Sequence, residues 1–159
     1  MKRDVIDRLY RWISDECYAV DREERFDELL NEMYDFSVIG GPFAHMQAAS
    51  VLKEVDPTAY RCGVNDYMSD TTYEIDGEEY DRDKADSARS EFIDELEMEI
   101  DKLQERIEAI EESLQDLEDS TDNPADVIGS VCDLEAEKEK LESEVAELRL
   151  DVKACQDLF

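Results

Sequence analysis

Histidine, cysteine and carboxylate side chains are the groups in this sequence from which a catalytic or metal site would be built. His45 is the only histidine, so a His-ligated metal cluster or a nucleophile–histidine pair would have to be built around it alone. The sequence also lacks the Gly-rich phosphate loop, the dinucleotide-binding motif and the H-E-x-x-H zinc motif. We therefore predict a protein that is not an enzyme, with no catalytic residues, no bound metal and no cofactor.

The four cysteines do not form a metal or redox motif. Cys17, Cys62, Cys132 and Cys155 stand far apart, without a C-x-x-C pair or a neighbouring histidine. We interpret them as buried small hydrophobic side chains with free thiols, as is usual inside cells. Charges interrupt the N-terminal MKRDVIDRLYRW every few residues, so we expect no apolar core of a secretory signal peptide there. No apolar run approaches membrane-spanning length either. We therefore expect a soluble intracellular protein that does not bind membranes.

Carboxylates dominate the charge of the chain. There are 46 Asp and Glu residues against 17 Lys and Arg residues, which gives a formal net charge of -29. Such a field repels DNA, RNA and anionic membranes and attracts basic protein surfaces. The composition therefore disfavours direct binding of nucleic acid and predicts a basic protein as the partner.

The excess of acids is greatest between Glu91 and Asp119, where 13 acids accompany two bases. On an α-helix this amounts to about one net negative charge per 4 Å, comparable with one charge per about 3.4 Å on a strand of B-DNA. We predict that this stretch contacts the partner, led by Glu97, Glu99, Asp101, Glu105, Glu108, Glu111 and Glu112.

Two explanations account for so many acids. In the first, the protein imitates the charge of a nucleic acid and occupies the binding groove of a basic protein, with fast and salt-sensitive association. In the second, the acids only keep a structural, oligomerising or virion-assembly protein in solution, or adapt it to a salty cytoplasm. The 10 Arg against 7 Lys, and the 22 Asp against 24 Glu, favour the salt-adapted version of the second explanation.

The apolar residues of the acidic stretch predict the helix that carries it. They alternate in spacing between three and four over four heptads, which is the pattern of a coiled-coil seam. The members of this first seam are Ile93, Leu96, Ile100, Leu103, Ile107, Ile110, Leu114 and Leu117. After a break at EDSTDNPAD, a second seam contains Val127, Val131, Leu134, Lys138, Leu141, Val145, Leu148, Val152, Cys155 and Phe159.

Two such helices joined by a short turn, at about residues 118–125, predict a long antiparallel coiled-coil hairpin. Asn123 is the expected N-cap of the second helix and Pro124 its first residue. Lys138 is the single polar member of the seams, and a polar seam residue commonly fixes register or oligomeric state. The alternative is an arm that also pairs with a second chain, as a homodimeric four-helix bundle.

Residues 1–82 differ in composition and predict a small globular domain. They contain all seven Tyr, the only Trp and four of the five Gly residues. Helical spacing and capping patterns predict helices over about residues 2–18, within residues 21–36, over residues 44–54, and from Pro57 onward. Asp21 is the expected N-cap of the second of these helices, with Glu24 completing a capping box.

Two segments of residues 1–82 predict β-structure. FSVIGGPF indicates a strand and a turn, and YEIDGEEY indicates a hairpin with a type I′ turn at Asp76-Gly77. The predicted fold class is therefore α+β and predominantly α. A small helical domain with one or two short β-hairpins occupies residues 1–82, and the acidic coiled-coil hairpin occupies residues 83–159.

The segment ASVLKEVDPTAYRCGVNDYMSD resembles a motif of small, mostly uncharacterised proteins encoded by phages and prophages, L-x-E-x-D-P-x-A-Y-R-x-G-x-x-D-Y. The matching residues are Leu52, Glu54, Asp56, Pro57, Ala59, Tyr60, Arg61, Gly63, Asp66 and Tyr67. The resemblance implies a viral origin and a place of action in the cytoplasm of an infected host cell. It implies no catalytic role.

The physical interpretation of this motif is structural. Asp56-Pro57 sets a turn, Ala59, Tyr60 and Tyr67 pack into a small core, and Arg61 pairs with a nearby acid. By analogy of charge and context, small acidic phage proteins include nucleic-acid mimics that inhibit restriction and CRISPR systems. The viral origin that the resemblance implies, taken together with the acidic charge, therefore predicts a phage accessory protein that inhibits a host defence system by binding a basic, nucleic-acid-binding host protein.

Overall fold

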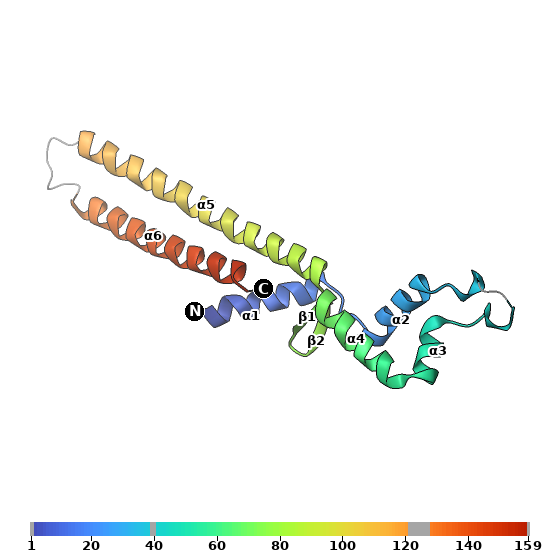
Figure 1. The fold of residues 1–159 in the computed structure, drawn as a ribbon. Helices are drawn as coiled ribbons and strands as arrows, with labels where there is room; N and C mark the ends of the chain where they lie inside the picture. The colour runs from blue at the N-terminus through green and yellow to red at the C-terminus, as the bar shows by residue number, and fades with distance from the viewer. Residues whose placement is uncertain (1, 39–40, 121–127, 159) are drawn as a thin grey trace. The chain divides into compact units, whose positions relative to one another are not determined.

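The chain folds predominantly into helices. The computed structural model describes residues 2–38, 41–120 and 128–158, which form six α-helices and one two-stranded antiparallel sheet (Figure 1). The predicted class, α+β and predominantly α, is confirmed.

Two compact units make up the chain. The arm unit comprises Met1–Arg11 together with Arg89–Phe159, and the central unit comprises Trp12–Ala88. Two helices, α1 (Lys2–Glu16) and α5 (Arg82–Ser120), have residues in both units. Sequence neighbours within each of these two helices therefore belong to different units.

Helix α1 forms where the apolar spacing predicts an amphipathic helix. Val5, Leu9 and Ile13, each four residues from the next, are almost completely buried. Val5 and Leu9 belong to the arm unit, whereas Ile13 belongs to the central unit. The helix ends at Glu16, two residues before the predicted end.

Helix α2 (Arg22–Met33) begins with the predicted cap. The Asp21 carboxylate accepts a hydrogen bond of 2.9 Å from the backbone N–H of Glu24, which satisfies one of the unpaired donors of the first turn. Phe26 is buried on the inner face of this helix.

The strand predicted for FSVIGGPF is wrong. The described residues of this segment form two short 3₁₀ helices, η1 (Phe36–Val38) and η2 (Gly41–Phe43). The Asp35 carboxylate accepts from the N–H of Ser37 at 2.8 Å, and this local turn competes with an extended backbone. β-propensity produces a strand only where a neighbouring strand and a packed face are available.

Helices α3 (Ala48–Val55) and α4 (Pro57–Thr71) follow. The predicted helix over residues 44–54 begins four residues later than expected, and its Ala48 and Ala49 are buried. Asp56 caps α4 by accepting from the N–H of Ala59 at 2.9 Å, with Pro57 at the first helical position.

The sheet is a single hairpin of β1 (Thr72–Ile75) and β2 (Glu78–Asp81). Its two loop residues, Asp76 and Gly77, have φ angles of 53° and 85°. Both angles are positive, as a type I′ turn requires, so the predicted turn is confirmed.

The central unit has an aromatic core in which residues of α2 pack against Tyr60 and Tyr67 of the 52–67 motif. Phe26 of α2 packs edge-on against Tyr60 of α4, with 5.5 Å between ring centroids, and against Tyr67 at 5.9 Å. A Cβ atom added to Gly63 would lie 2.5 Å from Cζ of Phe26, so only glycine lets the ring approach α4 so closely. Ala59, predicted to be in this core, is instead exposed, because it lies on the outer side of the first turn of α4.

Polar contacts stabilise the rim of this core. The buried Tyr60 hydroxyl donates to Oδ1 of Asp27 at 2.6 Å, and Nζ of Lys53 lies 2.7 Å from Oδ2 of the same carboxylate. The hydrogen bond to Asp27 raises the pKa of Lys53 above its ordinary value. The Arg25 guanidinium of α2 pairs with the Asp81 carboxylate of β2.

The arm unit contains the two longest helices, α5 and α6 (Ile128–Gln156), which lie side by side and run in opposite directions (Figure 1). Their 39 and 29 residues correspond to lengths of about 58 and 44 Å. Arg8 of α1 stacks over the ring of Phe92, 5.7 Å from its centroid, so the first turns of α1 belong to the same core.

The predicted seams face inward. In α5, Leu96, Ile100, Leu103 and Ile110 are buried, and the other four members are half-buried. In α6, Leu141, Val145, Val152 and Cys155 are buried, whereas Val131, Leu134, Lys138 and Leu148 are half-buried. The seam residues Val127 and Phe159, and the predicted turn with its Asn123 cap and Pro124, lie outside the described residues.

Candidate partner-binding surface

A row of carboxylates follows the outer side of α5. Its members are spaced by three, four or seven residues, which places them on one side of a helix with 3.6 residues per turn. All are exposed, and they lie opposite the buried seam: Asp94, Asp101, Glu105, Glu108, Glu112, Asp116 and Asp119. We call this set the acidic row. It extends over about 38 Å, because 25 residues separate its ends.

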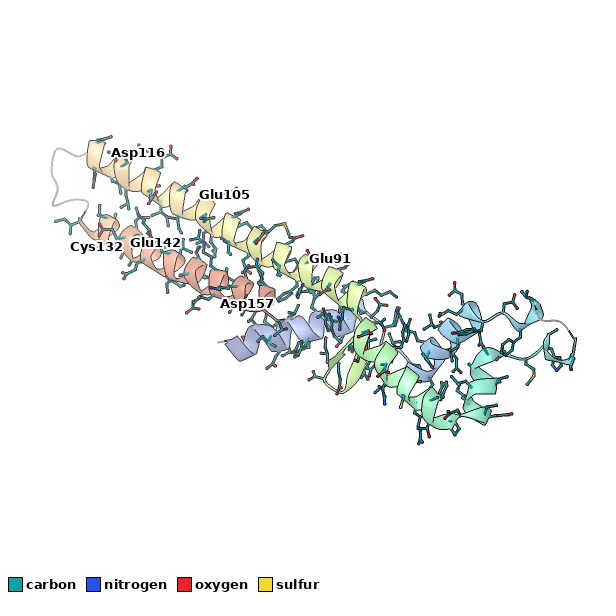
Figure 2. All side chains as sticks on the ribbon, viewed as in Figure 1. Glu91, Glu105, Asp116, Cys132, Glu142 and Asp157 are labelled. Carbon is teal, nitrogen blue, oxygen red and sulfur yellow. The ribbon has the colours of Figure 1, made fainter. Side chains whose placement is uncertain are left out.

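The seven acids predicted to bind a partner lie at different positions around the surface of α5. All seven are exposed, and Asp101, Glu105, Glu108 and Glu112 belong to the acidic row. Glu97 lies at the edge of the row, while Glu99 and Glu111 lie beside the seam, by their helical spacing. In Figure 2, Glu105 is on the side of α5 that faces away from α6.

Ion pairs between α5 and α6 use acids beside the seam rather than acids of the row. Nη2 of Arg106 lies 3.0 Å from Oε1 of Glu137, and Nζ of Lys138 lies 2.5 Å from Oε1 of Glu111. The hydrogen bond to Glu111 raises the pKa of Lys138, with Glu142 at 3.8 Å adding a smaller contribution. Between the residues that the structure describes, no ion pair involves a carboxylate of the acidic row.

The second helix of the arm differs in charge from the first. From Ile128 to Gln156, α6 has eight acids and four bases, which is an ordinary mixture for an exposed helix surface. The stretch from Glu91 to Asp119 of α5 has 13 acids and two bases. The excess of negative charge in the arm therefore belongs mainly to α5.

A second acidic surface, which the sequence did not predict, lies in the central unit. It is a groove of about 470 Å³ beside α2, where Leu29 and Tyr67 contribute apolar atoms. Its acids are Asp21, Glu24, Glu28 and Glu32. Glu24, Glu28 and Glu32 are four residues apart, so the sequence already places them on one side of a helix. They were missed because the same segment was interpreted only through its apolar, buried face.

His45 and the cysteines do not form a metal site in the described part of the chain. His45 is exposed, and within residues 2–38, 41–120 and 128–158 no group of three or more His, Cys, Asp or Glu side chains could hold a metal ion. The interpretation of the cysteines as buried residues holds for Cys155, whereas Cys17 is half-buried and Cys62 and Cys132 are exposed. In the same part of the chain, no helix combines the length and the apolar character needed to cross a membrane.

The fold and surface define an α+β, predominantly α-helical protein with an acidic row on one long helix. Comparison with protein-family models, with curated proteins and with solved structures gives no match.

Proposed function

We propose that this protein is a non-enzymatic inhibitor or adaptor that binds a basic, nucleic-acid-binding protein through the acidic row of α5. The observation that supports this proposal is the placement of charge. The row faces away from the seam, and the ion pairs between the arm helices use other acids. Its carboxylates are therefore available to a partner.

The proposal also requires a straight and stiff arm. We infer that α5 and α6 pack as an antiparallel coiled coil, because every seam residue among the described ones is buried or half-buried. A support of this kind holds the carboxylates in fixed order, which lowers the entropy lost when a partner binds. The proposed coiled coil thus presents a line of negative charge comparable in density with a nucleic-acid strand.

The phage-like motif gives the proposal its biological setting. If the protein is encoded by a phage, the partner is a host protein that binds DNA or RNA, such as a component of a restriction or CRISPR system. Binding then takes place in the cytoplasm of the infected cell and blocks the host protein's nucleic-acid groove. Charge complementarity supports fast association that weakens as salt rises.

Capture from host lysate tests this function. The full chain is immobilised at low salt, and bound proteins are eluted with rising salt and identified by mass spectrometry. The row variant Asp101→Asn, Glu105→Gln, Glu108→Gln, Glu112→Gln should lose the captured protein. The matched control, Glu135→Gln, Glu139→Gln, Glu144→Gln, Glu147→Gln, removes four exposed charges from α6 and should retain it.

Two results would contradict the proposal. One is recovery of no nucleic-acid-binding protein at low salt. The other is equal loss of capture from the row variant and the α6 control, which would mean that net charge alone is responsible. Competition by added DNA or RNA provides an independent check, because a mimic and a nucleic acid exclude each other from one groove.

A structural or oligomerisation role is the second candidate. Exposed apolar side chains on the arm favour it, namely Met98 on α5 and Leu150 on α6, which are 54% and 56% exposed. In that role the acids maintain solubility, and a second copy covers these side chains. Sedimentation over a range of concentrations distinguishes the candidates, since a strictly monomeric chain would contradict the oligomeric role.

A further inference from the structure

The bases of the arm leave a long interval without positive charge. Between Arg106 and Lys138 the sequence contains 11 acids and no Lys or Arg. The interval covers the end of α5 and the beginning of α6. We call the described parts of this interval beyond the ion-paired residues, 112–120 and 128–136, the tip. We call residues 96–110 with 141–155 the base segment.

The two bases that border the interval pair in opposite directions. Arg106 of α5 pairs with Glu137 of α6, and Lys138 of α6 pairs with Glu111 of α5. Each helix therefore supplies one cation and one anion at the same level of the arm. No described Lys or Arg lies beyond this level toward the tip.

Burial of the seam changes at the same level. In the base segment, eight of the ten seam residues are buried, and only Ile107 and Leu148 are half-buried. In the tip, the seam residues are only half-buried: Leu114 and Leu117 on α5, and Val131 and Leu134 on α6. Apolar packing is therefore weakest where uncompensated negative charge is most concentrated.

We propose that the two reciprocal ion pairs form a clasp, which separates a permanently paired base segment from a tip whose helix pairing depends on the screening of its charge. At low ionic strength, repulsion between the acids of the two helices opens the tip. Salt, or a cationic partner, screens this repulsion, and the tip closes on its half-buried seam. The clasp stops the opening from spreading into the base segment.

Lys138 is suited to this position because of its long apolar stem. Its side chain is 28% exposed and occupies a seam position, so the methylene groups lie within the seam while the ammonium reaches Glu111. Glu142, one turn further along α6, lies 3.8 Å from the same Nζ and adds a second anion. An apolar residue here would extend the seam but would not supply the cation.

Hydrogen–deuterium exchange of the full chain tests this inference without any partner. Exchange is compared in about 10 mM and about 1 M NaCl, where the Debye lengths are about 30 and 3 Å. Amides of the tip should exchange at least about tenfold more slowly at high salt, whereas those of the base segment should change about twofold or less. A salt effect of equal size in both parts, or none in the tip, would overturn the division.

Charge variants test the clasp itself. Arg106→Gln with Lys138→Gln should increase exchange at low salt in the base segment near Ile110 and Leu141, by about tenfold, and this increase should disappear at high salt. The control Lys102→Gln with Lys140→Gln removes one exposed base from each helix and should leave the base segment unchanged. Equal effects of the two pairs would show that total charge, rather than the clasp, controls opening. This test is independent of the proposed function, because the chain is measured alone.

Discussion

Replacing Gly63 by alanine should destabilise the central unit through a single contact. The added Cβ would lie 2.5 Å from Cζ of Phe26, whereas carbon atoms in favourable contact are about 3.5–4.0 Å apart. Phe26 must therefore shift by about 1 Å, although it is buried and contacts the Tyr60 and Tyr67 rings. Overpacking of this kind costs about 1–3 kcal/mol.

An opposing effect must be subtracted. Alanine is favoured over glycine inside a helix by about 1 kcal/mol. The expected net effect of Gly63→Ala is thus a loss of about 0–2 kcal/mol in the free energy of unfolding. Because this range includes zero, the single variant is a weak test, and a double-mutant cycle with Phe26→Leu is needed.

Leucine at position 26 lacks the ring atom that meets the new methyl group. In the Phe26→Leu background, Gly63→Ala should therefore stabilise by about 1 kcal/mol, from helix propensity alone. The coupling between the two positions should be about 1–3 kcal/mol. Urea unfolding of all four proteins, followed by the fluorescence of Trp12 in the central unit, measures this quantity. A coupling near zero, with stabilisation in both backgrounds, would refute the close approach of Phe26 to α4.

Two further predictions concern polar contacts of the central unit. Asp27→Ala should lower the free energy of unfolding by about 1–3 kcal/mol, because the buried Tyr60 hydroxyl and the Lys53 ammonium lose their shared acceptor. Urea unfolding at pH 7 measures this loss, and unchanged stability would contradict the prediction. Burial alone would raise the pKa of Asp81, but hydrogen bonds from Arg25 and from backbone N–H groups outweigh it and lower that pKa. The ionised Asp81 carboxylate therefore stabilises the fold above the ordinary pKa of an aspartate, and this stabilisation is lost as the pH falls through the lowered pKa. Asp81→Asn should be less stable than wild type at pH 7 and should lose less stability on acidification. Urea titrations from pH 7 to pH 2 would measure both effects.

Local signals predicted much of the central unit. The cap at Asp21, the position of Pro57 at the start of α4 and the turn at Asp76-Gly77 depend on side chains and φ angles within a few residues, and all three are present. The segment around Ser37 was predicted wrongly because a strand needs a partner that no local pattern reveals. The close approach of Phe26 to Gly63 joins residues from two helices, so the sequence could indicate only a structural role for the motif.

For the candidate surface, periodicity identified the helix and its outer face but not the use of individual acids. Heptad spacing alone places Glu111 beside the seam and Glu105 on the outer side of α5, where it faces away from α6 (Figure 2). Spacing does not identify Lys138 as the partner of Glu111, because this pairing depends on the alignment of α5 with α6, which a repeat of seven residues leaves undetermined by whole heptads. The reciprocal pairing of Arg106 and Lys138 could not be derived from spacing for the same reason.

The distribution of bases is the strongest argument against solubility as the sole reason for the acids. Solubility depends on total charge and is indifferent to which helix carries it. In this arm, α6 has a mixed surface, while the outer side of α5 carries the acidic row over about 38 Å. The bases Arg106 and Lys138 contact acids beside the seam and leave the row uncompensated. Stability alone would favour the reverse, with bases interspersed along the row, because like charges at neighbouring helical positions are destabilising. The basic partner proposed above would account for a one-sided row that persists against this cost.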